Sequence, residues 1–144
     1  MNKKFRNSKP GINEQKILRL LDANFNRAKE GFRVCEDICR FILNDAQKTA
    51  AFKTLRHRLT KIVEGLPFEA LIKSRDVEGD IGKKSLKTEL QRKDVADIFY
   101  ANSQRIKESL RVLEEFVKLS DKNFSSDIKE IRYKIYELEK NSFS

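Results

Sequence analysis

The chain has 144 residues, 37% of them charged, with five Gly, two Pro and no Trp, which argues against a second domain and favours long helices over short strands. No segment approaches the roughly 20 apolar residues of a membrane span, so we expect a cytoplasmic protein without a membrane partner. The formal net charge of +9 favours anionic partners in general, although a Lys- and Glu-rich surface can equally serve solubility or heat stability.

The first predicted helix has Asn13 as a candidate N-cap and ends near Asn44 and Asp45, about 30 residues later. Its apolar residues alternate steps of three and four, which places them along one side of the helix as a packing seam. They are Leu18, Leu21, Phe25, Ala28, Phe32, Cys35, Cys39 and Ile42. The spacing of the two cysteines fits neither a zinc knuckle nor a CxxC redox pair.

A second predicted helix carries Phe52, Leu55, Leu59 and Ile62, and it stops at Gly65 before Pro67. The short loop before it makes the two helices antiparallel neighbours. The connection from Gly65 to about Thr88 is longer than helical bundles usually need. We expect it to hold a short helix from Pro67 to Lys73, followed by the loop SRDVEGDIG.

Residues 89–141 repeat the helical hairpin of residues 13–64, with residues 65–88 as the connector. Adding 78 to the first seam gives Ala96, Phe99, Ser103, Ile106, Leu110, Leu113, Val117 and Ser120, and adding 76 to the second gives Ile128, Ile131, Ile135 and Leu138. Cys35 and Cys39 fall on Leu113 and Val117, so we expect both in the core. The pattern predicts one all-α domain, a four-helix bundle built from a duplicated antiparallel hairpin.

The repeat also keeps polar residues. ANFNRAKEGFRVCED at 23–37 and ANSQRIKESLRVLEE at 101–115 share Asn24/Asn102, Arg27/Arg105, Lys29/Lys107, Glu30/Glu108, Arg33/Arg111 and Glu36/Glu114, while Asp37 is matched by Glu115. One interpretation is a lattice of ion pairs between successive helical turns. Exposed pairs contribute only about 0.3–0.5 kcal/mol and tolerate Arg-to-Lys exchange. Survival of the same residues in both copies therefore favours phosphate binding by forked Arg donors.

Helical geometry places Asn24 and Arg27 at the start of a second stripe that continues through Val34, Ile38 and Phe41. We therefore expect Asn24 and Arg27 to be partly buried. An exposed apolar end of this stripe would favour a homodimer.

The connector segment RDVEGDIG places acidic side chains among glycines. It could hold a metal-bound phosphate, since carboxylates suit Mg²⁺ and glycines let backbone N–H groups approach an anion, or it could be a solvated turn. His57, the single histidine, is expected at a surface or interface rather than as a general base. Arg56 recurs as Arg132 and is the better candidate for a ligand contact.

Five strings, in this order, carry a family resemblance: LLDANFNRAKEGFRVCEDICRF, LRHRL, SRDVEGDIG, QRKDVADIFYAN and SLRVLEEFVKL. Together they resemble a small family found alone or fused in front of thiamine-phosphate synthase. The resemblance implies a hydroxymethylpyrimidine phosphate kinase, which uses ATP to convert the monophosphate of 4-amino-5-hydroxymethyl-2-methylpyrimidine into the diphosphate for thiamine synthesis. Members can carry the synthase's name, thiamine-phosphate pyrophosphorylase, through the fusion. We do not expect synthase activity, because the synthase is a TIM barrel of about 250 residues.

We assign roles to the site residues from the chemistry of phosphoryl transfer. The protein must position two phosphorylated substrates and neutralise the charge that develops on the transferred group. We hypothesise that Asp76 and Asp80 hold Mg²⁺ on the ATP phosphates, while Arg33, Arg75 and Arg111 clamp the phosphates of both substrates. Asn24 and Asn102, with Glu36 or Glu114, would bind the aminopyrimidine edge. Further substrate contacts are expected from Arg27, Asp37, Arg56 and Arg105.

Two other interpretations stay open. A non-catalytic basic module could dock nucleic acid or a partner helix, but its basic residues are interspersed with acids and without aromatic interleaving, so we expect no nucleic acid. The chain could also be a regulatory or dimerising partner of thiamine-phosphate synthase.

Overall fold

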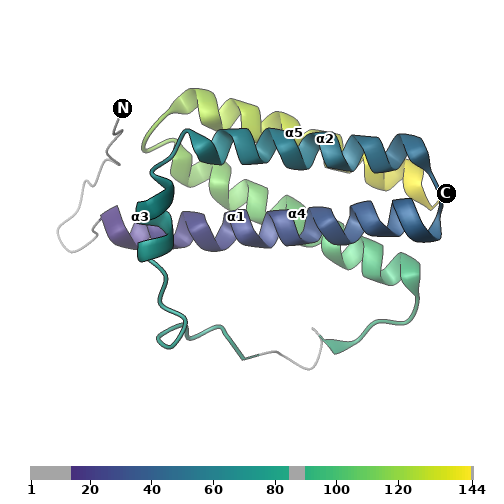
Figure 1. Ribbon diagram of the computed structural model, residues 1–144, viewed down its shortest axis with the longest axis horizontal. Coiled ribbons are helices and arrows are strands. Elements are labelled where there is room, and N and C mark those ends of the chain that lie inside the picture. Colours follow the sequence, from purple (N-terminus) through teal and green to yellow (C-terminus); the bar gives the residue numbers. More distant parts are fainter. Residues whose placement is uncertain (1–13, 85–89, 144) are drawn as a thin grey trace.

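The computed structural model describes residues 14–84 and 90–143, and helices are the only regular elements among them apart from isolated turns. The elements are α1 (Glu14–Asp37), the π-helix η1 (Ile38–Ile42), α2 (Ala46–Glu64), α3 (Phe68–Lys73), α4 (Val95–Val117) and α5 (Lys122–Ser142). Four long helices lie along one another, and the short α3 crosses one end of them (Figure 1). The all-α bundle expected from the sequence is confirmed, and so is the short helix in the connector.

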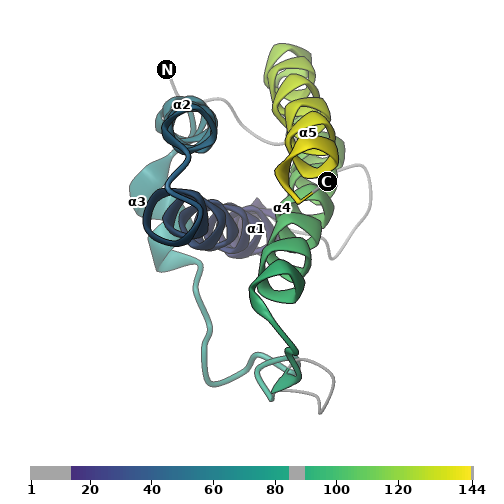
Figure 2. The same ribbon diagram turned by 90° about the vertical axis from the view of Figure 1, so that its right-hand side faces the viewer.

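The central layer of the bundle is the pair of helices α1 and α4, which pack against each other more extensively than any other pair. Helix α2 lies on α1 and α5 lies on α4, so each predicted hairpin is present, while α2 and α5 make far less contact (Figure 2). No helix in the described part of the chain is long and apolar enough to cross a membrane.

The predicted seams form the core. In α1 and η1 the buried seam residues run from Leu18 to Cys39, and in α4 from Phe99 to Val117. Both cysteines are fully buried and unpaired with each other, as expected for core residues. Because the four seams face a shared interior, their burial supplies the main driving force for folding.

The seam prediction is wrong at its last position in the first helix, because Ile42 is 58% exposed. The chain forms a π-helix from Ile38, where the Leu43 N–H donates to the Ile38 carbonyl five residues back at 3.0 Å. The extra residue in this turn rotates the following side chains relative to an α-helix. Leu43 packs against the core in place of Ile42.

Aspartates begin three of the helices. The carboxylates of Asp45, Asp94 and Asp121 accept hydrogen bonds from backbone N–H groups in the first turns of α2, α4 and α5, which is the usual N-cap arrangement. Before α2, Asn44 has a φ of 51°, a left-handed conformation that Asn tolerates better than most residues. The expected cap at Asn13 lies outside the described residues.

Gly31 lies where α1 crosses α4. A Cβ at this position would lie 2.7 Å from Cγ1 of Ile106 and 3.0 Å from the carbonyl oxygen of Asn102. Those distances are too short for ordinary packing, so the missing side chain permits the close approach of the two central helices.

The second stripe is only partly as predicted. Asn24 and Ile38 are buried, but Arg27 is exposed, and so is Phe41 at 68%. The prediction of a partly buried Arg27 is wrong because, within the described residues, an open groove lies on this side of α1.

Candidate functional site

An open groove of about 1020 Å³ lies between the N-terminal half of α1 and connector residues 75–81. Four cationic side chains line it, Lys16, Arg19, Arg27 and Arg75, together with four acidic ones, Asp22, Glu30, Asp76 and Asp80. Val112 contributes from α4. The groove therefore combines residues that are more than 40 positions apart in the sequence.

Polar contacts attach the connector to α1. Arg75 donates from Nε to Asp22 Oδ2 at 2.6 Å and from Nη2 to Asp22 Oδ1 at 2.9 Å, and this hydrogen-bonded pairing raises the pKa of the guanidinium. Arg19 donates from Nη2 to the backbone carbonyl of Asp76 at 3.1 Å. Because Asp22 is only 8% exposed, the forked pair is a well-defined contact rather than a loose surface ion pair.

The two carboxylates of the connector are held by their own loop. Asp76 Oδ1 accepts a hydrogen bond from the Gly79 N–H at 2.7 Å, and Asp80 Oδ1 accepts one from the Gly82 N–H at 3.0 Å. A Cβ at Gly79 would overlap the Asp76 carboxyl group, whose Cγ would lie 2.8 Å away. Gly79 therefore leaves room for the position that Asp76 adopts.

The acidic residues of the groove suit Mg²⁺ that is held jointly by the protein and by substrate phosphates. Within residues 14–84 and 90–143, no three His, Cys, Asp or Glu side chains lie close enough to form a metal site by themselves. Mg²⁺ commonly keeps its waters and binds through one or two carboxylates together with substrate phosphates. Asp76 and Asp80, both at the groove, suit this shared mode.

Other predicted site residues lie away from the groove, in two equivalent clusters. In the first, Glu36 pairs with Arg33 Nη1 at 3.1 Å and with Arg56 Nη2 at 3.3 Å. In the second, Glu114 pairs with Arg111 Nη1 at 3.7 Å and with both Nε and Nη2 of Arg132. The side chains of Glu36 and Glu114 are almost completely buried. Here the repeated polar residues form the ion pairs of the first interpretation.

The remaining candidates are dispersed. Arg105 Nη2 lies 3.7 Å from Glu30 Oε2, across the α1–α4 interface. Asn24 and Asn102 each donate from Nδ2 to the backbone carbonyl four residues back, at 2.9 and 2.8 Å, so their shared presence has a local structural explanation. Asp37 ends α1, half-buried, and His57 is exposed on α2. Of the predicted set, the groove brings together Asn24, Arg27, Arg75, Asp76 and Asp80.

Comparison with known proteins agrees with the motifs. A family model described as ThiD2 family matches residues 19–141, which is most of the chain. The chain belongs to the ThiD2 family. No solved structure matches it.

Curated relatives of this ThiD2 member carry the name thiamine-phosphate synthase. The relative from Rhodopirellula baltica is 42% identical over 121 residues, covering 83% of this chain and 32% of the relative. The relative from Nostoc punctiforme is 40% identical over 129 residues, covering 89% and 36%. The relative from Synechocystis is 40% identical over 124 residues, covering 85% and 35%. The chain thus spans about a third of the length of the relatives it matches.

The two repeats of this ThiD2 member differ at the groove. Lys16, Arg19 and Asp22 of the first repeat correspond, 78 residues on, to Asp94, Asp97 and Tyr100 of the second. The carboxylate of Asp94 caps α4, and that of Asp97 accepts from the Lys93 N–H at 3.1 Å. Of the four groove cations, Lys16 and Arg19 thus have no cationic counterpart in the second repeat, whereas Arg27 recurs as Arg105 and Arg75 belongs to the connector. Lys16, Arg19 and Asp22 were not among the predicted site residues, because the prediction weighted positions that the two repeats share and these three positions differ between the repeats.

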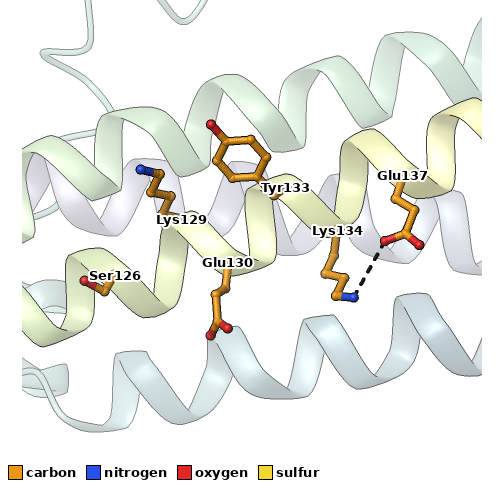
Figure 3. Close-up of a pocket in the computed structure, with 6 residues that line it drawn as sticks. All are labelled: Ser126, Lys129, Glu130, Tyr133, Lys134 and Glu137. Carbon is orange, nitrogen blue, oxygen red and sulfur yellow. Dashed lines mark ion pairs between the residues drawn. The ribbon is translucent and has the colours of Figure 1, made fainter.

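A second hollow of about 360 Å³ lies along the outer side of α5 (Figure 3). All six residues that line it belong to this one helix, and they include the ion pair of Lys134 with Glu137 at 3.6 Å.

Tyr133 and Tyr136 also lie on α5, and Lys129 and Arg132 each lie over the Tyr133 ring. The expectation of no aromatic interleaving is therefore wrong for α5. The glutamates of the same helix keep the surface mixed in charge, so the groove of the ThiD2 fold remains the better candidate site.

Proposed function

We propose that the chain is an ATP-dependent hydroxymethylpyrimidine phosphate kinase, which transfers a phosphoryl group to the monophosphate of the pyrimidine and forms the diphosphate. Membership of the ThiD2 family and the thiamine-phosphate synthase names of its relatives support a role in thiamine synthesis. The motifs of the sequence support the kinase step. Synthase activity is not proposed, because the chain spans only a third of those relatives.

The observation that carries the proposal is the meeting of cations and carboxylates in one groove. Phosphoryl transfer between two phosphorylated substrates requires the protein mainly to position them and to balance charge that develops on the transferred group. Lys16, Arg19, Arg27 and Arg75 supply positive charge, and Asp76 and Asp80 lie beside them. The groove has ample volume for such ligands, since small-molecule sites typically measure about 300–1,000 Å³.

We assign the phosphate contacts to Arg19, Arg27 and Arg75 rather than to Arg33 and Arg111. Arg27 is exposed, and its Nη1 is 3.5 Å from Asn24 Oδ1, at the limit of a hydrogen bond, so its guanidinium can turn toward an anion. Arg33 and Arg111 instead face Glu36 and Glu114. The acceptor phosphate is already ionised at neutral pH, so no strong general base is needed and His57 has no role in the proposal.

Mg²⁺ and ATP are the cofactors of the proposed reaction. Mg²⁺ bound with the nucleotide would neutralise charge on its phosphates, and Asp76 and Asp80 would be its carboxylate ligands. Asn24 and the acidic side chain of Glu30, both at the groove, are candidates for the aminopyrimidine edge, because an amide and a carboxylate supply the acceptors and donors it needs.

The test is an assay of the purified chain with ATP, Mg²⁺ and the pyrimidine monophosphate, read as diphosphate formation. We expect turnover by the wild type, a loss of at least tenfold in kcat/KM for Arg27→Lys and Asp80→Asn, and little change for Arg58→Lys, which is not among the residues that line the groove. Absence of diphosphate from a folded sample would contradict the kinase and leave a non-catalytic module. Full activity of both groove variants would contradict the site.

A further inference from the structure

Asp22 is a buried carboxylate that the proposed chemistry does not use. It is the one acidic residue of the groove that lies inside α1 with both oxygens engaged by a residue of the connector, Arg75, at 2.6 and 2.9 Å. Asn26 adds a hydrogen bond from Nδ2 to Asp22 Oδ1 at 3.3 Å and another to the Asp22 carbonyl at 3.0 Å. Asn26, a residue of the same helix, thus helps to orient the carboxylate that binds Arg75.

In its described part, the connector beyond this contact lies on the surface of the molecule. Residues 75–84 are all exposed, and the side chains of Val77 and Ile81 are directed into solvent rather than into the core. Burial of apolar surface therefore cannot fix the path of this segment, and its position relative to α1 depends on polar contacts. Two such contacts join the described residues of the connector to α1: the forked Asp22–Arg75 pair, in which Asp22 is buried, and the longer, exposed hydrogen bond from Arg19 to the Asp76 carbonyl.

We propose that Asp22 is a positioning residue, which holds residues 75–82 against α1 and thereby places the guanidinium of Arg75 and the carboxylates of Asp76 and Asp80 at the phosphate-binding part of the groove. This inference deepens the proposed function and rests on it. With Nε and Nη2 of Arg75 committed to Asp22, the Nη1 group is left to face a ligand. A guanidinium that is fixed by one fork loses less conformational freedom when it binds a phosphate.

The second repeat supports the functional interpretation over a purely structural one. The position that corresponds to Asp22 is Tyr100, which is 42% exposed, so the second central helix folds and packs without any such carboxylate. The bundle therefore does not require this residue type at this place. The first repeat carries a carboxylate, Asp22, at the place where the connector contacts α1 through Arg75.

The experiment compares Asp22→Asn, Arg75→Gln and the double variant with the wild type. Three quantities are measured: affinity for inorganic pyrophosphate with Mg²⁺ by calorimetry, hydrogen exchange of the Gly79 and Gly82 amides without ligand, and kcat and KM in the kinase assay. We expect each single variant to lose at least tenfold in pyrophosphate affinity and to exchange both amides faster. The double variant should lose no more than the worse single variant, because one contact is broken in each case.

The matched control is Arg58→Gln with Glu130→Gln, an exposed pair between α2 and α5 at 3.1 Å, which should leave all three quantities unchanged.

Two outcomes would overturn the inference: unchanged pyrophosphate affinity and amide exchange in Asp22→Asn, or losses in Arg75→Gln that add to those of Asp22→Asn. If Asp22→Asn folds poorly, the exposed Arg75→Gln variant carries the test through the exchange of the Gly79 and Gly82 amides, because its pyrophosphate affinity also reflects the direct contact of Arg75 with phosphate. Pyrophosphate binding and amide exchange need no turnover. A wild type that shows the expected binding and protection but forms no diphosphate would therefore overturn the proposed reaction and leave the positioning role of Asp22 standing.

Discussion

Arg132 on α5 donates two hydrogen bonds to the buried carboxylate of Glu114 on α4, one from Nε and one from Nη2, the latter at 3.2 Å. The corresponding pair of the first repeat, Arg56 and Glu36, is looser: Nη2 lies 3.3 and 3.4 Å from the two oxygens, and the buried Nε of Arg56 has no hydrogen-bond partner in the described structure. The duplicated bundle has thus kept the same residues with unequal contacts.

This inequality predicts unequal effects on stability. Glu114→Ala leaves the half-buried Arg132 without its carboxylate partner and should cost about 3 kcal/mol of unfolding free energy, whereas Glu36→Ala should cost clearly less. Urea unfolding measures both. Glu130→Ala, which removes an exposed partner of Arg58, should stay within about 1 kcal/mol. Equal losses for Glu36→Ala and Glu114→Ala would contradict the difference in geometry.

A substitution at Gly79 tests the position of the Asp76 carboxylate. An added Cβ overlaps that carboxyl group, so Gly79→Ala should displace Asp76 and weaken binding of ATP with Mg²⁺ by about tenfold or more while leaving the melting temperature nearly unchanged. Gly82→Ala is the matched control, because its Cβ would meet only Asp80 Oδ1 at an ordinary 3.6 Å. Similar nucleotide affinities for the two variants, measured by calorimetry, would show that Asp76 does not contribute.

Gly31→Ala should act on the fold instead of the site. The new methyl group would press on Ile106 and on the backbone of α4, and overpacking of this kind costs about 1–3 kcal/mol. Chemical unfolding should show the loss, and the folded fraction should keep its affinity for pyrophosphate. Ser109→Ala, at the corresponding place in α4, removes volume and serves as the control. A stabilised Gly31→Ala variant would contradict this prediction, because it would mean that α1 and α4 can move apart enough to accept the added methyl group.

The buried cysteines give a prediction on pH. Burial, and to a lesser degree the neighbouring Cys39, raises the pKa of the Cys35 thiol above its ordinary value of 9.0. The thiol therefore stays protonated in the folded protein while it ionises in the unfolded chain, so stability is unaffected below about pH 9 and declines above it. Unfolding free energies measured across this range should fall less steeply in Cys35→Ala. Rapid alkylation of the native protein at mildly alkaline pH would contradict the prediction, because only the thiolate reacts.

Much of the fold was predictable, because burial follows the spacing of apolar residues and the repeat checks each seam against a second copy. Leu21, Phe32 and Leu113 are buried as expected. The exposure of Ile42 was not predictable in the same way. A π-turn changes the direction in which the following side chains point, and no sequence pattern indicates where such a turn forms. The exposed Arg27 has a comparable cause, because periodicity shows which side of a helix is next to the seam but not whether another element covers it.

The site was predicted less completely than the fold. Local composition led to the prediction of Arg75, Asp76 and Asp80, but not of Arg19 and Asp22, which contact this segment in the structure, because contact between a helix and a distant connector leaves no periodic trace. Residues shared by the two repeats suggested ligand chemistry for Glu36 and Glu114, and in the structure each of these carboxylates pairs with a half-buried arginine of a neighbouring helix. Identity between internal repeats can thus reflect an inherited packing requirement as strongly as a chemical one.

The acidic start of α4 has a consequence for stoichiometry. Because Asp94 and Asp97 occupy the places that Lys16 and Arg19 hold in α1, an anionic ligand that fits the first half of the molecule is repelled from the corresponding place in the second. A titration should therefore saturate at a single equivalent of ligand per chain.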